Sequence, residues 1–193
     1  GKGSRFATAG FRSDKYMLPT KGGQTIIAQI VDSFSKCEKF LFVLNKDHGN
    51  KINLDGILRE RLDDYRIIEV SDTDGQLTTV KLALQRTMDW WRNDEHLWIF
   101  NGDTLRYSGI PSDIWKRFDN AEGLIEVFRK EGTHWSFVDR LGKVSKVTEK
   151  VKISNLCSTG LYGFKSIDVF IRYAHRSEMR LGEHYIAPLY NQL

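Results

Sequence analysis

The sequence predicts an α/β fold, in which a mostly parallel sheet is flanked by helices and the second half of the chain is rich in antiparallel strands. Two observations predict it. Up to Phe100, short continuous apolar runs alternate with amphipathic stretches, as buried parallel strands and crossover helices do. From Gly123 onward, strand-like segments follow one another with little room for helices, which favours antiparallel pairing. At 193 residues, the chain is expected to form one domain around one core.

Hydrophobic spacing places the elements of the first half. Apolar residues recur at helical spacing from Thr25 to Phe34, which predicts an amphipathic helix. The next segment, 39–45, is a continuous apolar run ended by polar residues, which is typical of a buried strand. The same reasoning predicts a helix at Leu54–Leu62, a strand at Arg66–Val70, a helix at Thr79–Trp91 and a strand at Leu97–Phe100.

The second half is expected to form antiparallel strands, in part as a lid over the first half. The strands are expected at Leu124–Phe128, Trp135–Val138, Val144–Thr148 and Gly160–Phe164, and two helices at Asp168–Ala174 and His184–Leu193. Because ligands of parallel α/β sheets bind at the carboxyl ends of the strands, residues that follow the first-half strands are candidates for a site.

Composition excludes several classes of protein. Twenty-nine Lys and Arg against 25 Asp and Glu give a net charge of +4, spread along the chain, which favours a small anionic ligand over nucleic acid. The longest apolar runs, such as Phe40–Leu44, are too short to cross a bilayer, so no membrane insertion is expected. Cys37 and Cys157 are too few for a disulfide framework, which indicates a cytoplasmic protein with reduced thiols. The five histidines lack the spacing of a zinc site.

A glycine-rich segment opens the chain at residues 1–6. Glycines allow the backbone to approach an anion closely, so its N–H groups can hold phosphate, although a surface turn explains the segment equally well. Arg5 lies within this segment and Lys15 follows it, and two cations beside one glycine loop suit a polyphosphate. Because the chain opens within a loop, we expect a strand to precede Gly1 in the natural protein.

Several carboxylates are candidates for chemistry. Asp103 follows a buried strand and a glycine, where its oxygens could bind Mg²⁺ together with substrate phosphates, or could cap the next turn. The Glu149–Lys150 pair follows a strand and could equally be a surface ion pair. Glu183 could be an acid at the start of a helix. These readings stay open from the local sequence alone.

Taken in order, the motifs of the chain resemble the sugar-phosphate nucleotidyltransferase family, and most closely its short bacterial members associated with capsule and surface polysaccharides. The resemblance spans essentially the whole chain and depends on the order and spacing of the motifs. They are Gly-Lys-Gly-Ser-Arg-Phe at 1–6, Lys15 to Pro19, Thr73-Asp-Gly-Gln76, Phe100-Asn-Gly-Asp103, Glu149-Lys150, Thr159-Gly-Leu-Tyr162 and Gly182-Glu183.

The resemblance implies nucleotide-binding roles for residues of the first half. The family's glycine loop wraps the triphosphate, which falls here to Gly1, Gly3 and Ser4, while Arg5 matches the loop arginine that stabilises the phosphates. Lys15 matches the lysine of the family's Pro-Lys pair, with Asp14 in place of the proline. The base-binding stretch of the family falls on Gly75 and Gln76, with Thr78 nearby.

Metal and acceptor roles are implied in the same way. Asp103 matches the metal-binding aspartate, and Glu149 with Lys150 matches the acceptor-binding pair. Gly160 and Glu183 match positions that line the acceptor pocket. Many family members carry a second metal-binding aspartate at a point beyond Leu193.

The implied enzyme has a Rossmann-like (GT-A-like) catalytic domain over residues 1–193, with a nucleotide-binding half at 1–122 and an acceptor-binding half at 123–193. It joins a nucleoside triphosphate to a sugar phosphate, with Mg²⁺, giving an NDP-sugar or a CMP- or UDP-type activated product and pyrophosphate. Arg5, Lys15, Asp103 and Lys150 would be its catalytic residues.

Three alternatives remain beside this reading. One is a cytidylyltransferase acting on a non-sugar phosphate such as phosphocholine, which would use the same residues. Another is a non-catalytic, nucleotide-binding regulatory subunit, although a site without turnover has no chemical need for all four catalytic residues. A glycosyltransferase is less favoured, because Asn101-Gly-Asp103 is not the Asp-x-Asp metal motif common in those enzymes. The sequence leaves the nucleotide base, the acceptor and the oligomeric state open.

Overall fold

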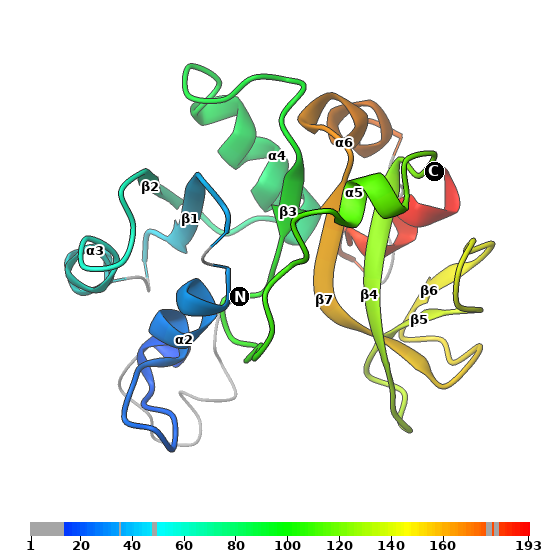
Figure 1. The fold of residues 1–193 in the computed structure, drawn as a ribbon, viewed down its shortest axis with the longest axis horizontal. Helices are drawn as coiled ribbons and strands as arrows, with labels where there is room; N and C mark the ends of the chain where they lie inside the picture. The colour runs from blue at the N-terminus through cyan, green and yellow to red at the C-terminus, as the bar shows by residue number, and fades with distance from the viewer. Residues whose placement is uncertain (1–13, 35, 48–49, 177–178, 180–181) are drawn as a thin grey trace. The chain divides into compact units, whose positions relative to one another are not determined.

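The chain contains two compact units, each assembled from two segments of sequence (Figure 1). The computed structural model describes residues 14–34, 36–47, 50–176, 179 and 182–193. The first unit contains the described residues up to Asp72 together with Gly102–Ile114. The second contains Thr73–Asn101 and Trp115–Leu193.

The first unit is built on two parallel strands and the helix between them. Strand β1 (Phe40–Asn45) pairs with β2 (Tyr65–Val70), and helix α3 (Lys51–Leu58) connects them. Helix α2 (Ile26–Ser33) and a short 3-10 turn, η1 (Lys15–Met17), precede β1. The core contains the buried faces of both helices and of β1, formed by Ile27, Val31, Leu44, Leu54 and Leu58.

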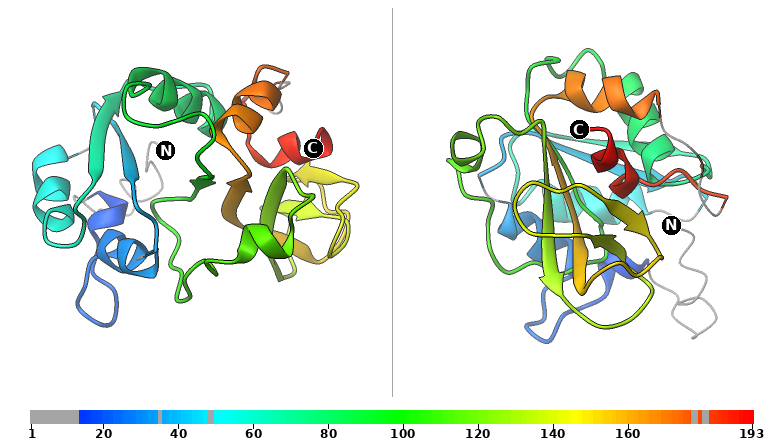
Figure 2. Two further views of the ribbon diagram at one scale, coloured as in Figure 1. Left: turned by 45° about the horizontal axis from the view of Figure 1, so that its top comes forward. Right: turned by 90° about the vertical axis from the view of Figure 1, so that its right-hand side faces the viewer.

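The second unit is built on an antiparallel sheet of five strands. These are β3 (Leu97–Ile99), β4 (Gly123–Arg129), β5 (Ser136–Val138), β6 (Val147–Glu149) and β7 (Leu156–Phe164). Strand β7 is central: it pairs with β4 along one edge and with β3 and β5 at the two ends of its other edge (Figures 1 and 2). Strand β6 continues the sheet beyond β5.

Helices complete the second unit. They are α4 (Gln76–Arg86), α6 (Ile167–Ala174), the 3-10 helix η2 (Ala187–Asn191) and α5 (Ile114–Arg117), which begins at the last residue of the first unit. The Ser166 hydroxyl accepts the N–H of Val169 and caps α6. The core joins the sheet to α6 and η2, with Val138, Phe164, Phe170 and Ile186 almost fully buried. This core holds the loops at the ends of the strands in place.

The observed fold is mixed α/β, with parallel and antiparallel sheets, and the antiparallel second half is confirmed. The prediction of a mostly parallel sheet is wrong for the strands that the structure describes, because only β1 and β2 pair in parallel. Strand β3 is apolar as expected, but it pairs antiparallel with β7. An apolar run indicates that a strand is buried, but it does not show whether the neighbouring strand is parallel or antiparallel. The helix expected at His184–Leu193 is only the short η2, which contains Pro188.

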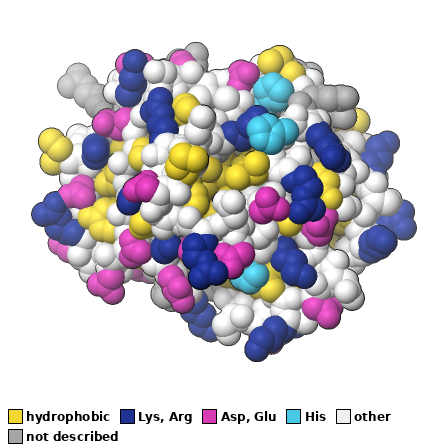
Figure 3. Space-filling model, turned by 90° about the horizontal axis from the view of Figure 1, so that it is seen from above, with side chains coloured by type: hydrophobic (Ala, Val, Ile, Leu, Met, Phe, Trp, Pro, Cys, Tyr) yellow, Lys and Arg dark blue, Asp and Glu magenta, His cyan; other side chains and the backbone are white. Residues whose placement is uncertain are grey.

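The surface carries charges of both signs. Figure 3 shows Lys and Arg side chains interspersed with Asp and Glu on the face that it displays, and not gathered in a block of one sign. Within the described part of the chain, no helix has the length and apolar character that crossing a bilayer requires.

Candidate functional site

The candidate residues fall into three local groups, and each group lies within one unit. Lys15 and Asp103 lie in the first unit. The second unit holds one group around Gly75, Gln76 and Gly160, and another formed by Glu149, Lys150 and Glu183. The predicted phosphate-binding residues Gly1, Gly3, Ser4 and Arg5 lie outside the described residues.

Lys15 and Asp103 form an ion pair across 88 positions of sequence. The ammonium of Lys15 donates to Asp103 Oδ2 at 2.5 Å. The two side chains are 35% and 42% exposed, so water screens the attraction and the pair contributes little to stability. Both charges remain accessible to a ligand. The structure therefore unites a cation and a carboxylate that the sequence singled out separately.

Asp14 fastens the segment that carries Lys15. Its Oδ2 accepts the Tyr16 hydroxyl at 2.8 Å and the backbone N–H of Asn50 at 3.0 Å. Asn50 in turn caps α3. Burial, opposed by the hydrogen bond to Asn50 and aided by Asp14, raises the pKa of Tyr16 to about 12, so this phenol stays neutral. The aspartate that stands in place of the family's proline thus ties η1 to the start of α3.

Two polar residues at the carboxyl ends of the parallel strands were missed by the sequence analysis. Asn45 ends β1, and its Nδ2 donates to Asp72 Oδ1 at 2.6 Å, two residues beyond β2. Asn45 also accepts the N–H of Asp47. The available signal was their position, because each lies at or just after the carboxyl end of an apolar strand, at the edge where α/β proteins bind ligands.

A second group surrounds an unpaired stretch of the β7 edge. Among the described strands, β3 pairs with β7 only as far as Tyr162 and β5 only as far as Cys157, which leaves 158–161 without a partner on that edge. Gly160 lies in this stretch with φ +88°, and a Cβ there would overlap the side-chain amide of Asn101. Asn101 Oδ1 accepts from Gln76 Nε2 at 2.9 Å. Gln76 and Gly160 therefore meet through Asn101.

The start of α4 is tied to the segment that follows Gly182. Gly75 has φ +137°. The residues Asp74 and Leu77, on either side of it in sequence, both form backbone hydrogen bonds with His184. The N–H of His184 donates to the Asp74 carbonyl at 2.7 Å, and the N–H of Leu77 donates to the His184 carbonyl at 3.0 Å. These backbone hydrogen bonds join the segment of Gly75 and Gln76, the candidates for base binding, to the segment of Glu183, a candidate for acceptor binding.

Thr78 lies half-buried in the first turn of α4. The hydroxyls of Thr73 and Thr79 make the contacts at this turn. They lie 2.6 Å apart, where one donates to the other, and they lie 3.1 and 3.0 Å from the Gly75 carbonyl oxygen, which accepts the remaining hydroxyl hydrogen. They fix the loop that presents Gln76.

Glu149 and Lys150 stand where β6 ends. Ser136 donates its hydroxyl to Glu149 Oε2 at 2.5 Å. Burial raises the pKa of Glu149, while Ser136 and Lys150 oppose the rise and the charge of Glu183 adds to it. Lys150 has φ +57°, in the left-handed region, and its ammonium donates to the Tyr185 hydroxyl at 2.9 Å. Tyr185 was not singled out in the sequence, because the contact joins positions far apart in the chain.

The backbone of Lys150 leads to a stability prediction. A side chain with a Cβ is strained in the left-handed region, whereas glycine is not. We expect Lys150→Gly to be more stable than Lys150→Ala by about 1 kcal/mol, measured as the free energy of unfolding in urea. Equal stability of the two variants would contradict a strained backbone at this position.

No protein-family model and no curated protein matches the chain, but solved structures do. A nucleoside-diphosphate-sugar pyrophosphorylase from Vibrio cholerae RC9 is 31% identical, with a TM-score of 0.86, and the match covers 100% of this chain and 84% of that one. The chain belongs to the sugar-phosphate nucleotidyltransferase family. It is therefore an enzyme of the nucleotidyltransferase class.

Two more distant structures share the nucleotidyltransferase fold. One, a UDP-glucose pyrophosphorylase complexed with UDP-glucose, is 15% identical, with a TM-score of 0.76, and the match covers 100% of this chain and 84% of that one. The other, an inositol-1-phosphate CTP transferase from T. maritima, is 16% identical, with a TM-score of 0.69 and coverage of 99% and 75%. At these identities the likeness shows the fold alone.

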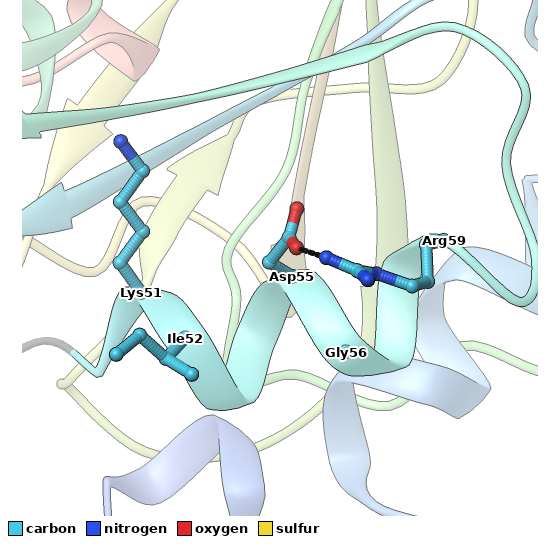
Figure 4. Close-up of a pocket in the computed structure, with 5 residues that line it drawn as sticks. All are labelled: Lys51, Ile52, Asp55, Gly56 and Arg59. Carbon is cyan, nitrogen blue, oxygen red and sulfur yellow. Dashed lines mark hydrogen bonds and ion pairs between the residues drawn. The ribbon is translucent and has the colours of Figure 1, made fainter.

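A hollow on α3 of the nucleotidyltransferase lies apart from the candidate residues in sequence and contains none of them (Figure 4). It has a volume of about 450 Å³ and is lined by Lys51, Ile52, Asp55, Gly56 and Arg59. Arg59 donates to Asp55, so these charges satisfy each other, and Ile52 is 84% exposed. Lys51 adds an exposed cation to this hollow.

The donor set for a metal in this nucleotidyltransferase is small. The described residues contain no group of three or more His, Cys, Asp and Glu side chains placed to hold a metal ion. Asp103 offers a partly exposed carboxylate whose Oδ2 faces Lys15. Such a donor fits Mg²⁺, which commonly binds through one or two carboxylates, with water and substrate phosphates as its other ligands.

Proposed function

We propose that this enzyme transfers a nucleotidyl group from a nucleoside triphosphate to a sugar phosphate, giving an NDP-sugar and pyrophosphate. An oxygen of the acceptor phosphate forms a bond to the α-phosphorus, and the bond between the α-phosphorus and the bridging oxygen of the β-phosphate breaks. Pyrophosphate leaves with that electron pair. The protein needs to align and neutralise two anions, and no covalent protein intermediate is required.

The arrangement of Glu149 and Lys150 is the observation that carries the proposal. Lys150 presents an exposed ammonium at a strained backbone position, and strain of this kind clusters at functional sites. Glu149 is fixed beside it by Ser136. A cation next to a carboxylate suits an acceptor that carries a phosphate and, near it, hydroxyl groups that donate hydrogen bonds.

The triphosphate is assigned to Lys15 and to the glycine loop of Gly1, Gly3 and Ser4 with Arg5. The exposure of Lys15 supports this role, because its ammonium can exchange the Asp103 carboxylate for a phosphate. Gly75, Gln76 and Thr78 are assigned to the base. Support comes from the Gln76 side chain, which is held by Asn101 at the first turn of α4.

Mg²⁺ is assigned to Asp103. When bound, it would neutralise phosphate charge and bridge the triphosphate to the protein. Asp103 would supply the carboxylate that holds the cation, and Lys15 would bind phosphate oxygens.

The division of labour proposed from the family is a nucleotide-binding half at 1–122 and an acceptor-binding half at 123–193, in a Rossmann-like (GT-A-like) arrangement. The likeness to short bacterial family members supports a cytoplasmic role in surface polysaccharide synthesis. Gly160 and Glu183 are assigned to the acceptor pocket.

The test is pyrophosphate release over a panel of reactants. ATP, CTP, GTP, UTP and dTTP would each be combined with glucose 1-phosphate, mannose 1-phosphate, inositol 1-phosphate and phosphocholine, with Mg²⁺. We expect turnover with a sugar phosphate. Turnover with CTP and phosphocholine alone would favour the cytidylyltransferase alternative, and triphosphate binding without any turnover would favour the regulatory one.

Lys150→Ala is expected to raise the KM for the acceptor about tenfold or more, because a charge-assisted contact to phosphate is lost. The KM for the triphosphate should change little. Steady-state kinetics with the best reactant pair measures both. Lys143→Ala, which removes another exposed lysine of the same unit, is the control. If Lys150→Ala has wild-type acceptor kinetics, Lys150 does not bind the acceptor, and the Glu149–Lys150 pair is only a surface ion pair.

A further inference from the structure

The ammonium of Lys150 is held by one specific group, the hydroxyl of Tyr185. Nζ lies 2.9 Å from that oxygen and 5.1 Å from the centre of the ring. The hydroxyl, and not the face of the ring, therefore makes the closer contact. The partner residues are 35 positions apart, so the contact depends on the fold of the second unit.

Both ends of this contact are anchored by their own backbones. On the lysine side, the N–H of Lys150 donates to the Trp135 carbonyl at 3.0 Å, and the Thr148 hydroxyl donates to the Val151 carbonyl at 2.6 Å, which closes the turn after β6. The left-handed backbone of Lys150 lies inside this turn. The direction in which its side chain leaves the sheet is therefore fixed.

On the tyrosine side, the neighbouring residues are fixed as well. His184 is hydrogen-bonded through both its N–H and its carbonyl to the start of α4. Ile186 and Ala187, which follow Tyr185, are each 1% exposed. Tyr185 is half-buried between these anchors, whereas Lys150 is exposed. A fixed phenol thus holds a side chain that would otherwise sample many rotamers.

The partner of the Lys150 ammonium is a neutral hydroxyl, which leaves the charge available for a phosphate. A neutral hydroxyl orients an ammonium without cancelling its charge, whereas a carboxylate would compete with an incoming phosphate. The carboxylate next in sequence, Glu149, is engaged by Ser136. The hydrogen bond to Tyr185 raises the pKa of Lys150, and the charges of Glu149 and Glu183 add to the rise, so the ammonium stays protonated.

We propose that Tyr185 is a positioning residue that pre-orients the ammonium of Lys150 to bind the phosphate of the acceptor. The proposal rests on the function proposed above, in which Lys150 binds that phosphate. It adds a residue to the acceptor site from the segment that also carries Glu183. It predicts that loss of one hydroxyl weakens acceptor binding while leaving triphosphate binding intact.

The test compares Tyr185→Phe with the wild-type chain. The ring is kept, so folding should survive, and thermal melting checks this. Acetylation of Lys150 by acetic anhydride, followed by mass spectrometry, gives the pH dependence of its labelling and the concentration of inorganic phosphate that protects it. In Tyr185→Phe, we expect the labelling midpoint to shift to lower pH and about three- to tenfold more phosphate to be needed for protection. Tyr107→Phe, at an 81% exposed tyrosine, is the control.

Kinetics provide the second readout. With the reactant pair that turns over best, Tyr185→Phe should raise the KM for the acceptor about three- to tenfold and leave the KM for the triphosphate within about twofold. Wild-type labelling, protection and acceptor KM in Tyr185→Phe would overturn the proposal. The two proposals fail separately: absence of turnover in the wild-type chain counts against the proposed function, whereas the phosphate-protection experiment needs no turnover.

Discussion

Asp103→Asn is expected to reduce the rate of pyrophosphate release by about 100-fold or more, because a charge that stabilises the transition state is removed. Asparagine keeps the size of the side chain but not the anionic donor that a hard cation requires. The ion pair with Lys15 is lost as well, because an amide oxygen at position 103 can accept a hydrogen bond but carries no charge. The effect on stability should be small, at most about 1 kcal/mol, because the ion pair is exposed.

The measurement is turnover by Asp103→Asn across a Mg²⁺ titration, with thermal melting as the check on folding. Asp63→Asn, at an exposed aspartate of the same unit, is the matched control. Asp103 has two proposed roles: it holds the cation and it orients Lys15. Lys15→Gln and the double variant Lys15→Gln/Asp103→Asn separate them. If Asp103 acts only through Lys15, the double variant is no slower than Lys15→Gln. A folded Asp103→Asn enzyme with wild-type turnover and Mg²⁺ dependence would remove Asp103 from the site.

Gly75→Ala is expected to destabilise the second unit by about 3 kcal/mol or more, since it combines a strained backbone with a steric overlap. The added Cβ would lie 2.6 Å from the nitrogen of His184 and would overlap its carbonyl oxygen. These atoms belong to a backbone segment that cannot rotate away. The hydrogen bonds from Leu77 and to Asp74 would have to lengthen or break.

Thermal unfolding measures this effect. A loss of about 3 kcal/mol corresponds to a fall of roughly 6–12 °C in Tm for a chain of this size. Gly142→Ala is the matched control, because Gly142 has φ +80° but nothing within 4 Å of an added Cβ. It measures the cost of a positive φ without a steric overlap, at a φ lower than the +137° of Gly75. If Gly75→Ala loses no more stability than Gly142→Ala, the prediction of a large added cost at Gly75 is wrong.

The sequence predicts the positions of most elements, because buried residues recur at helical spacing in helices and form continuous apolar runs in strands. The Thr25–Phe34 segment becomes α2, and the apolar run at 39–45 becomes β1. The partner of a strand and the direction of its pairing are not visible in this pattern. Strand β3 was expected in a parallel sheet for its apolar character, yet its partner is the antiparallel β7, whose residues come much later in the chain.

The candidate site shows the same limit. The order of the motifs identifies Lys15, Asp103 and Lys150 as residues of interest, but not the contacts that give them a defined position. In the sequence, Asp14 is only a departure from the family pattern, whereas in the structure its carboxylate anchors the segment that carries Lys15. Tyr185 had no motif of its own, because its importance arises from a contact that only folding creates.

The central position of β7 has a consequence for how the protein is made. Strands β3, β4 and β5 all pair with it, and all three precede it in the chain. On a ribosome that adds about 5–20 residues per second, the first of these strands waits several seconds for its partner to emerge. Pairings this distant in sequence also close slowly. The nascent chain therefore exposes the β7-facing edges of β3, β4 and β5 until Phe164 has left the ribosome.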